Sequence, residues 1–284
     1  MGRRQAWGVA GGVAGGAGLF TGGIAVGRLL RLDSQRGDYR RAWEDHDLAT
    51  LALLDSLRDA PASDHPFTIV ALGDSATQGI GASRVEEGYL PRLASAIGAT
   101  LDRGVALLNL SISGGTSETV TLTELPQLRG LDLPGRNVTP DLFTLNIGGN
   151  DVMLADLGID AFRGRMAAIC GALPAGSLIG NIPSFGVLRS ETRAAEMSQT
   201  LDEVATACGH HVVDLRALSE EFSIAKYAFG YHAADLFHPN SAAYADWAQR
   251  FADAWTTSRG LAPVLVSEAP GWEMLSARVA QSQA

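Results

Sequence analysis

The stretch "IVALGDSATQGIGAS", residues 69–83, guides the interpretation of the whole chain. Its four leading apolar residues are typical of a buried strand, and Gly-Asp-Ser follows at once. A turn explains the motif by itself, since Asp and Ser cap helices and Gly permits a tight backbone. The alternative is a nucleophile, Ser75, held at a strand end where a substrate reaches it. That choice depends on whether a base and an oxyanion hole occur elsewhere.

Five short apolar runs alternate with amphipathic stretches in the body of the chain. Apolar steps of four residues from Tyr89 to Leu101 predict a helix, and Pro239 and Asn240 are start signals for a later one. Strands separated by helices indicate an α/β fold, a three-layer α/β/α sandwich with a central parallel sheet. In such sheets ligands bind beyond the carboxyl ends of the strands. The runs are FTIVAL (67–72), VALLNL (105–110), LFTLNI (142–147), SLIGNI (177–182) and HVVDL (211–215).

Polar clusters follow these runs at the ends where a ligand would bind. Each cluster alone is most simply a turn or a capped helix start, but together they supply the groups that acyl transfer needs. Ser75 is the predicted nucleophile, His238 its general base, and Asp235 the carboxylate that orients the imidazole. The backbone N–H of Gly114 and the side-chain amide of Asn150 are predicted to stabilise an oxyanion, together with the Ser75 N–H.

These clusters resemble the motifs of the SGNH/GDSL hydrolase family. Ser75 in "GDS", Gly114 in "NLSISGGTS", Asn150 in "GGND" and His238 in "DLFHP" match its four namesake residues in order, and Asp235 matches its triad acid. The resemblance implies a flavodoxin-like sandwich and ester or thioester hydrolysis through an acyl-enzyme, without metal or cofactor. The G-x-S-x-G elbow of α/β-hydrolases occurs nowhere in the chain.

We therefore expect a serine esterase that hydrolyses an acyl ester of a lipid, an acylated sugar or a similar small molecule. Two alternatives remain open: an acyltransferase with the same site, and a membrane-tethered binding module without activity. The formal net charge is −9, and because residues 1–41 carry +5, the rest carries −14. An acidic body argues against nucleic acid as a partner. A metal pair at His210 and His211 would need further ligands, which cannot be placed from the sequence, so both are interpreted as strand-edge residues.

The N-terminus has a different character from the body. Residues 6–27 contain no charge and have about the length that crosses a bilayer. They are interpreted as a membrane anchor, with a cleaved signal peptide as the alternative, and the body is expected on the outer face. Five Arg that follow the stretch argue against that orientation. The predicted divisions are an anchor or signal segment (1–31), a charged helical spacer (32–66), the hydrolase domain (67–258) and a C-terminal extension (259–284).

The walls of the acyl pocket are only weakly indicated. Pro183, Ser184 and Phe185 lie near the active end of the sheet, although core packing explains them almost as well. His232 is interpreted as a solvated loop residue rather than a pocket wall. Four aromatic residues on the approach to the triad suggest an apolar or sugar-stacking wall, with packing under a loop as an equal alternative. They are Phe222, Tyr227, Phe229 and Tyr231.

Two cysteines each end a helical stretch just before a predicted strand. Cys170 and Cys208 have two open interpretations: a disulfide on an oxidising side of the membrane, or two buried thiols. We favour the thiols.

Overall fold

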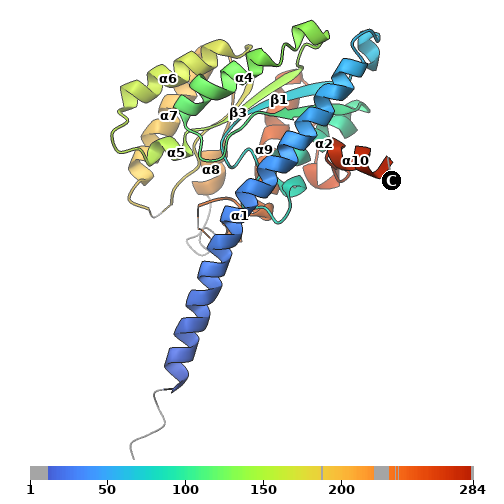
Figure 1. Cartoon of the computed structure of the whole chain (residues 1–284). Coiled ribbons are helices and arrows are strands. Elements are labelled where there is room, and N and C mark those ends of the chain that lie inside the picture. Colours follow the sequence, from blue (N-terminus) through green and yellow to red (C-terminus); the bar gives the residue numbers. More distant parts are fainter. Residues whose placement is uncertain (1–11, 187, 221–229, 234, 236, 283–284) are drawn as a thin grey trace, which may run out of the picture.

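A five-stranded parallel sheet with helices on both faces forms the centre of the computed structural model (Figure 1). The structure describes residues 12–186, 188–220, 230–233, 235 and 237–282, with the side chains of the first helix described from residue 34. Each predicted apolar run contains one strand. The strands are β1 (Phe67–Gly73), β2 (Val105–Asn109), β3 (Leu142–Asn146), β4 (Leu178–Gly180) and β5 (His211–Val213).

The strand order is β2-β1-β3-β4-β5, the flavodoxin-like arrangement. β1 pairs with β2 on one side and with β3 on the other, so the direction of winding changes at β1. The pairs Ala71–Asn109 and Gly73–Asn146 bring the carboxyl ends of the three strands to one edge. A crevice at this change of direction is where ligands of open parallel sheets bind, so Ser75, two residues after β1, lies at the expected place.

Helices of very different length connect the strands. α2 covers the predicted stretch from Tyr89, and α9 begins directly after Asn240, whose side chain caps it by accepting from the N–H groups of Ala242 and Ala243. The α-helices are α1 (Gly12–Ser56), α2 (Tyr89–Leu101), α3 (Ser117–Thr119), α4 (Leu125–Gly130), α5 (Gly149–Val152), α6 (Ile159–Ala172), α7 (Glu191–Ala207), α8 (Leu215–Glu220), α9 (Ser241–Arg259) and α10 (Leu275–Ser282). Short 3₁₀ segments are η1 (Ala62–Asp64), η2 (Val85–Glu87), η4 (Pro134–Arg136) and η6 (Val266–Glu268), and η3 (Val120–Glu124) is a π-helical turn.

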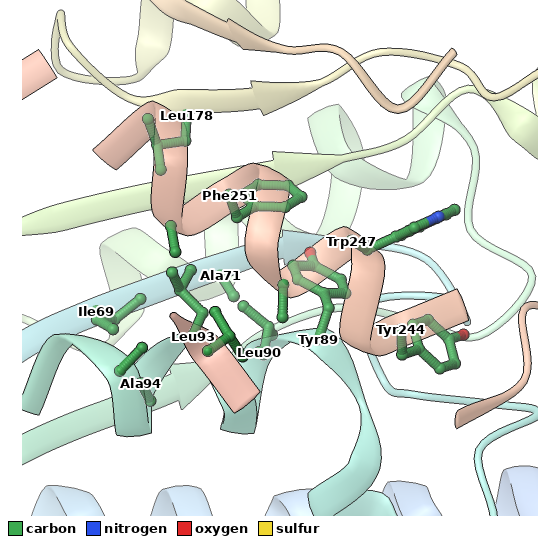
Figure 2. Packing of buried hydrophobic residues seen from close by; sticks show 14 of the residues in the cluster. Ile69, Ala71, Tyr89, Leu90, Leu93, Ala94, Leu178, Tyr244, Trp247 and Phe251 are labelled. Carbon is green, nitrogen blue, oxygen red and sulfur yellow. The ribbon is translucent and has the colours of Figure 1, made fainter. Parts of the chain in front are cut away.

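Two apolar layers hold the helices on the sheet. On one face α2 and α9 pack under β1, where the rings of Tyr89 and Phe251 stack with centroids 4.7 Å apart (Figure 2). On the other face α6 and α7 bury Phe162 and Met197 against β1 and β3. β1 itself is buried along its whole length. This double burial explains why the strands appear in the sequence as continuous apolar runs instead of alternating ones.

The segment that we expected to be a charged spacer packs against the body instead. One helix, α1, runs across the predicted division at residues 31 and 32, and its later part covers the sheet next to β2. Trp43 and Leu54 are 2% and 0% exposed, whereas Leu48 of the same helix is 67% exposed. Leu48 follows Trp43 by five residues, about 140° around the helix, and so faces away.

The C-terminal extension also packs on the body. Val266 and Met274 are buried in the same apolar layer as Trp43. The ring of Trp272 lies 6.1 Å from that of Trp43, so the C-terminal extension packs on the later part of α1.

The predicted anchor, residues 6–27, finds no support in the structure. Within the described ranges, no helix is both long and apolar enough to cross a membrane. Residues 6–11 of the predicted anchor lie outside those ranges.

Candidate active site

Ser75 lies on a tight turn that requires a glycine at position 73. Gly73 ends β1 at φ +143°, and a Cβ there would approach the carbonyl oxygen of Asn146 to 2.2 Å. The carboxylate of the following Asp74 accepts a hydrogen bond of 2.9 Å from the Ala76 N–H, and this Asx turn reverses the chain. The close approach of β1 and β3 therefore places the Ser75 side chain at the carboxyl edge of the sheet.

His238 connects Ser75 with Asp235, as the sequence predicts for these three residues. Its Nε2 is 2.8 Å from Ser75 Oγ, and its Nδ1 is 2.5 Å from Asp235 Oδ2. Asp235 Oδ1 also accepts from the backbone N–H groups of Phe237 and His238, both at 3.0 Å. With Nδ1–H donating to the carboxylate, Nε2 is the nitrogen that accepts the Ser75 proton.

The carboxyl group of Asp235 is held in its charged form. Burial alone would raise its pKa, but hydrogen bonds from the His238 ring and from two backbone N–H groups lower it to about 2. Asp235 therefore remains a carboxylate throughout the neutral range and keeps the proton of His238 on Nδ1.

The predicted oxyanion donors surround the same turn. Gly114 lies on the loop after β2 at φ +78°, with open space where a side chain would be. Asn150, in α5 after β3, donates from Nδ2 to the Gly115 carbonyl at 2.8 Å and lies 3.4 Å from Asp74 Oδ2. Among the described residues, the backbone N–H groups of Ser75 and Gly114 have no acceptor. Three N–H donors from three strand ends thus lie around the turn.

Buried carboxyl groups support these loops, and sequence reasoning missed them. Asp151 is fully buried and accepts from both the N–H and the hydroxyl of Ser117. Glu124 accepts from the Gly73 N–H at 2.8 Å, and burial raises its pKa to about 8. Burial raises the pKa of Asp74 to about 6, against the lowering effects of the Ala76 N–H and of His238. Their spacing carries no recognisable pattern, although "GGND" and "GDS" each contain one of them.

A largely apolar cavity opens beside Ser75 and His238. The predicted wall residues Pro183, Ser184 and Phe185 line it, and so does Tyr231. His232, interpreted from the sequence as a solvated loop residue, is half-buried and also lines the cavity, and its backbone forms a bridge with Pro239. Three predicted aromatics, Phe222, Tyr227 and Phe229, lie outside the described residues. Other lining residues, which the sequence did not indicate, are Asn146, Ile147, Ile182, Leu188, Ser219, Phe237 and Trp247.

The remaining candidates lie away from this cavity. His210 is buried, with Nε2 2.9 Å from the Cys170 carbonyl oxygen, and His211 is on the edge strand β5. In the part of the chain that the structure describes, no three potential metal ligands come together. Cys170 and Cys208 are both free thiols, and burial raises the pKa of Cys170 to about 12.

The fold and this edge define a class: a flavodoxin-like α/β protein whose Ser, His and Asp side chains form a hydrogen-bonded chain at the strand ends. Within that class the chain belongs to the GDSL-like Lipase/Acylhydrolase family, whose sequence model matches residues 71–245. The match includes all five predicted site residues. Comparison with curated proteins finds no match.

Solved structures with the same fold include several described esterases and lipases. The lipase/acylhydrolase from Enterococcus faecalis is 20% identical with a TM-score of 0.51, covering 69% of this chain and 97% of that one. Axe2, an acetylxylan esterase from Geobacillus stearothermophilus, is 18% identical with a TM-score of 0.51, covering 69% and 95%. TesA is 22% identical with a TM-score of 0.52, covering 67% and 99%. Since these neighbours are covered almost completely, the rest of this chain is additional to the fold that they share.

Proposed function

We propose that this protein is a serine esterase that hydrolyses a carboxylic ester through an acyl-enzyme on Ser75. The observation that carries the proposal is the unbroken hydrogen-bonded chain from Ser75 Oγ through His238 to Asp235, beside an apolar cavity. Membership of a lipase/acylhydrolase family and the esterases and lipases among the structural neighbours support it.

Acylation begins with attack of Ser75 Oγ on the ester carbonyl carbon. The Ser75 proton passes to His238 Nε2, and the resulting imidazolium lies against the Asp235 carboxylate. The negative charge moves to the former carbonyl oxygen, which the N–H groups of Ser75, Gly114 and Asn150 stabilise. The C–O bond to the alcohol then breaks, and His238 returns the proton to the leaving oxygen.

Deacylation repeats the sequence with water as the nucleophile. His238 takes a proton from water as it attacks the acyl carbon, and then gives that proton to Ser75 Oγ as the acid leaves. Asn150 Nδ2 carries two N–H groups. One donates to the Gly115 carbonyl at 2.8 Å, and the other makes the longer contact, 3.4 Å, with Asp74 Oδ2. This second N–H is the one that donates to the oxyanion.

The cavity walls favour an apolar acyl group as the part of the substrate bound beside Ser75. Ile182, Phe185 and Trp247 line its interior, and Leu188 and Phe237 contribute at its mouth, where they are 46% and 37% exposed. Hydrolysis rates of p-nitrophenyl esters from acetate to palmitate should therefore depend on chain length. Equal rates along the series would contradict an acyl pocket.

The test of the proposal compares two serines of the same cavity. Ser75→Ala should reduce kcat for p-nitrophenyl butyrate by at least about 10³-fold, because the nucleophile is lost. Ser184→Ala is the matched control, since Ser184 Oγ accepts from the Gly186 N–H, whereas the base His238 is bound to Ser75. Ser75→Ala with wild-type turnover would refute the mechanism, and a folded wild-type protein without hydrolysis would indicate a binding module.

We also propose, from the sequence alone, that the body lies on the outer face of a membrane. The uncharged stretch of residues 6–27 behind two Arg motivates this location. Protease digestion of intact cells, with a cytoplasmic control protein scored alongside, tests it. Digestion of the body while the control survives supports the location, and a body that is digested only after lysis refutes it.

A further inference from the structure

The helix α1 lies outside the family match, yet its side chains bind the loop that follows Ser75. This nucleophile loop is residues 76–82. Gln35 Oε1 accepts from the Gly81 N–H at 3.0 Å, and Gln35 Nε2 donates to the Ala82 carbonyl at 2.7 Å. The hydroxyl of Tyr39, one turn further on, donates to the same carbonyl at 2.9 Å. Three hydrogen bonds from one helix thus fix the end of the nucleophile loop.

A second connection runs from α1 toward the oxyanion donors. Trp43 is buried, and its Nε1 donates to the Gln78 carbonyl at 3.0 Å. The side chain of Gln78 donates in turn to the Ser111 carbonyl at 2.7 Å. Ser111 begins the loop that carries Gly114, so α1 and both loops of the site belong to one hydrogen-bonded unit.

The opposite side of the nucleophile loop touches His238. Gly81 has φ +98°, and a Cβ there would lie 2.3 Å from the Pro239 carbonyl oxygen and 3.0 Å from His238 Cβ. The Tyr244 hydroxyl also donates to the Ile80 carbonyl at 2.7 Å. The loop therefore lies between α1 and the backbone of the proposed base, in van der Waals contact with it.

The C-terminal extension fixes α1 from outside. His46 of α1 packs edge-on against Trp272, with centroids 4.9 Å apart, and its Nδ1 accepts from the Leu275 N–H at 2.8 Å. The two regions that extend beyond the family match thus pack on each other and not only on the sheet.

We propose that α1 is a brace that positions His238 against Ser75 through the nucleophile loop, with Gln35 and Tyr39 as positioning residues. The inference rests on the proposed esterase function. A looser loop lengthens the distance between Ser75 Oγ and His238 Nε2 and lowers the rate of proton transfer, while the apolar walls that Ile182, Phe185 and Trp247 contribute to the acyl cavity stay in place. The expected signature is a fall in kcat at constant KM.

The experiment measures kcat and KM of the full chain with p-nitrophenyl butyrate for three variants. Gln35→Ala should lower kcat by about ten-fold or more, since displacements of about 1 Å reduce catalysis strongly. Gln35→Glu, which keeps the acceptor for the Gly81 N–H and loses the donor, should fall between Gln35→Ala and wild type. Leu48→Ala, on the exposed face of the same helix, is the matched control and should match wild type.

Labelling by a fluorophosphonate gives a second readout that needs no turnover. Its rate on Gln35→Ala should fall by the same factor as kcat, because the same proton transfer limits both. A Gln35→Ala protein with wild-type kcat, beside an inactive Ser75→Ala protein, overturns the brace and leaves the esterase proposal intact. If Gln35→Ala fails to fold, Tyr39→Phe decides, since it removes one hydroxyl: wild-type kcat in that variant overturns the brace. A wild-type chain without esterase activity refutes the function itself.

Discussion

Asp235 shows how one side chain sets the protonation of the site. Replacing it with Asn keeps one oxygen for the backbone N–H groups of Phe237 and His238, and so turns the NH₂ group toward Nδ1. The imidazole then carries its proton on Nε2, where it cannot accept the Ser75 proton. We expect Asp235→Asn to lower kcat by about 10²- to 10⁴-fold.

Steady-state hydrolysis at pH 8 measures this loss. Asp214→Asn is the control, since Asp214 binds Asn181 and the Ala217 N–H away from the triad. A kcat for Asp235→Asn within a few-fold of wild type would contradict the proposed tautomer.

The buried carboxyl group of Glu124 should make the free energy of unfolding decrease as the pH rises. Burial raises its pKa from 4.5 to about 8, so between these values the folded protein retains a proton that the unfolded chain has lost. The free energy of unfolding should then decrease by about 1.4 kcal/mol per pH unit from this group. Glu124→Gln should remove that slope in urea unfolding from pH 6.5 to 8. An unchanged slope in the variant would show that Glu124 is ionised in the fold.

Among the secondary-structure elements, the strands and the helices α2 and α9 were predictable because their signals are local. Each strand is a continuous apolar run, and α9 begins at a capping Asn after a Pro. The docking of α1 was not predictable. Its inward face carries Trp43, His46 and Thr50, two of which are polar, so its burial leaves no apolar stripe in the sequence. Trp43 and His46 reach carbonyl groups of the body, and Thr50 pairs with His46 within the helix. Charges on its other face gave the impression of a solvated spacer.

The contact between α1 and the C-terminal extension should weaken in acid. Burial lowers the pKa of His46 from 6.5 to about 4, against the raising effect of the Leu107 carbonyl, and Nδ1 must stay unprotonated to accept from the Leu275 N–H. Between those values the unfolded chain binds the extra proton, so the free energy of unfolding should fall by about 1.4 kcal/mol per unit as the pH drops.

His46→Gln, which offers both an acceptor and a donor without titrating, isolates this effect. The difference between wild type and His46→Gln in chemical unfolding should change with pH from 6.5 to 4 and be constant above 7. A difference that does not vary with pH would contradict a neutral, buried His46.

For the molecule as a whole, the candidate site residues are easier to predict from the sequence than the residues that hold their loops in place. Ser75, Gly114, Asn150 and His238 lie in short motifs at strand ends, and the parallel sheet brings those ends together. The groups that hold the loops in place leave no such motif. Gln35 and Gly81, for example, are 46 residues apart, and their hydrogen bond depends on the packing of an entire helix. The extensions therefore appeared separate from the domain on which they pack.

The central claim is that Ser75 is the nucleophile of an ester hydrolase, and the most direct measurement is the site of covalent labelling. The full-length protein is treated with a fluorophosphonate until esterase activity is lost, then digested and mapped by mass spectrometry. We predict one phosphonyl group per chain, on Ser75, with labelling abolished in His238→Ala. Complete loss of activity with Ser75 unmodified, or with the label on another residue, would contradict the account.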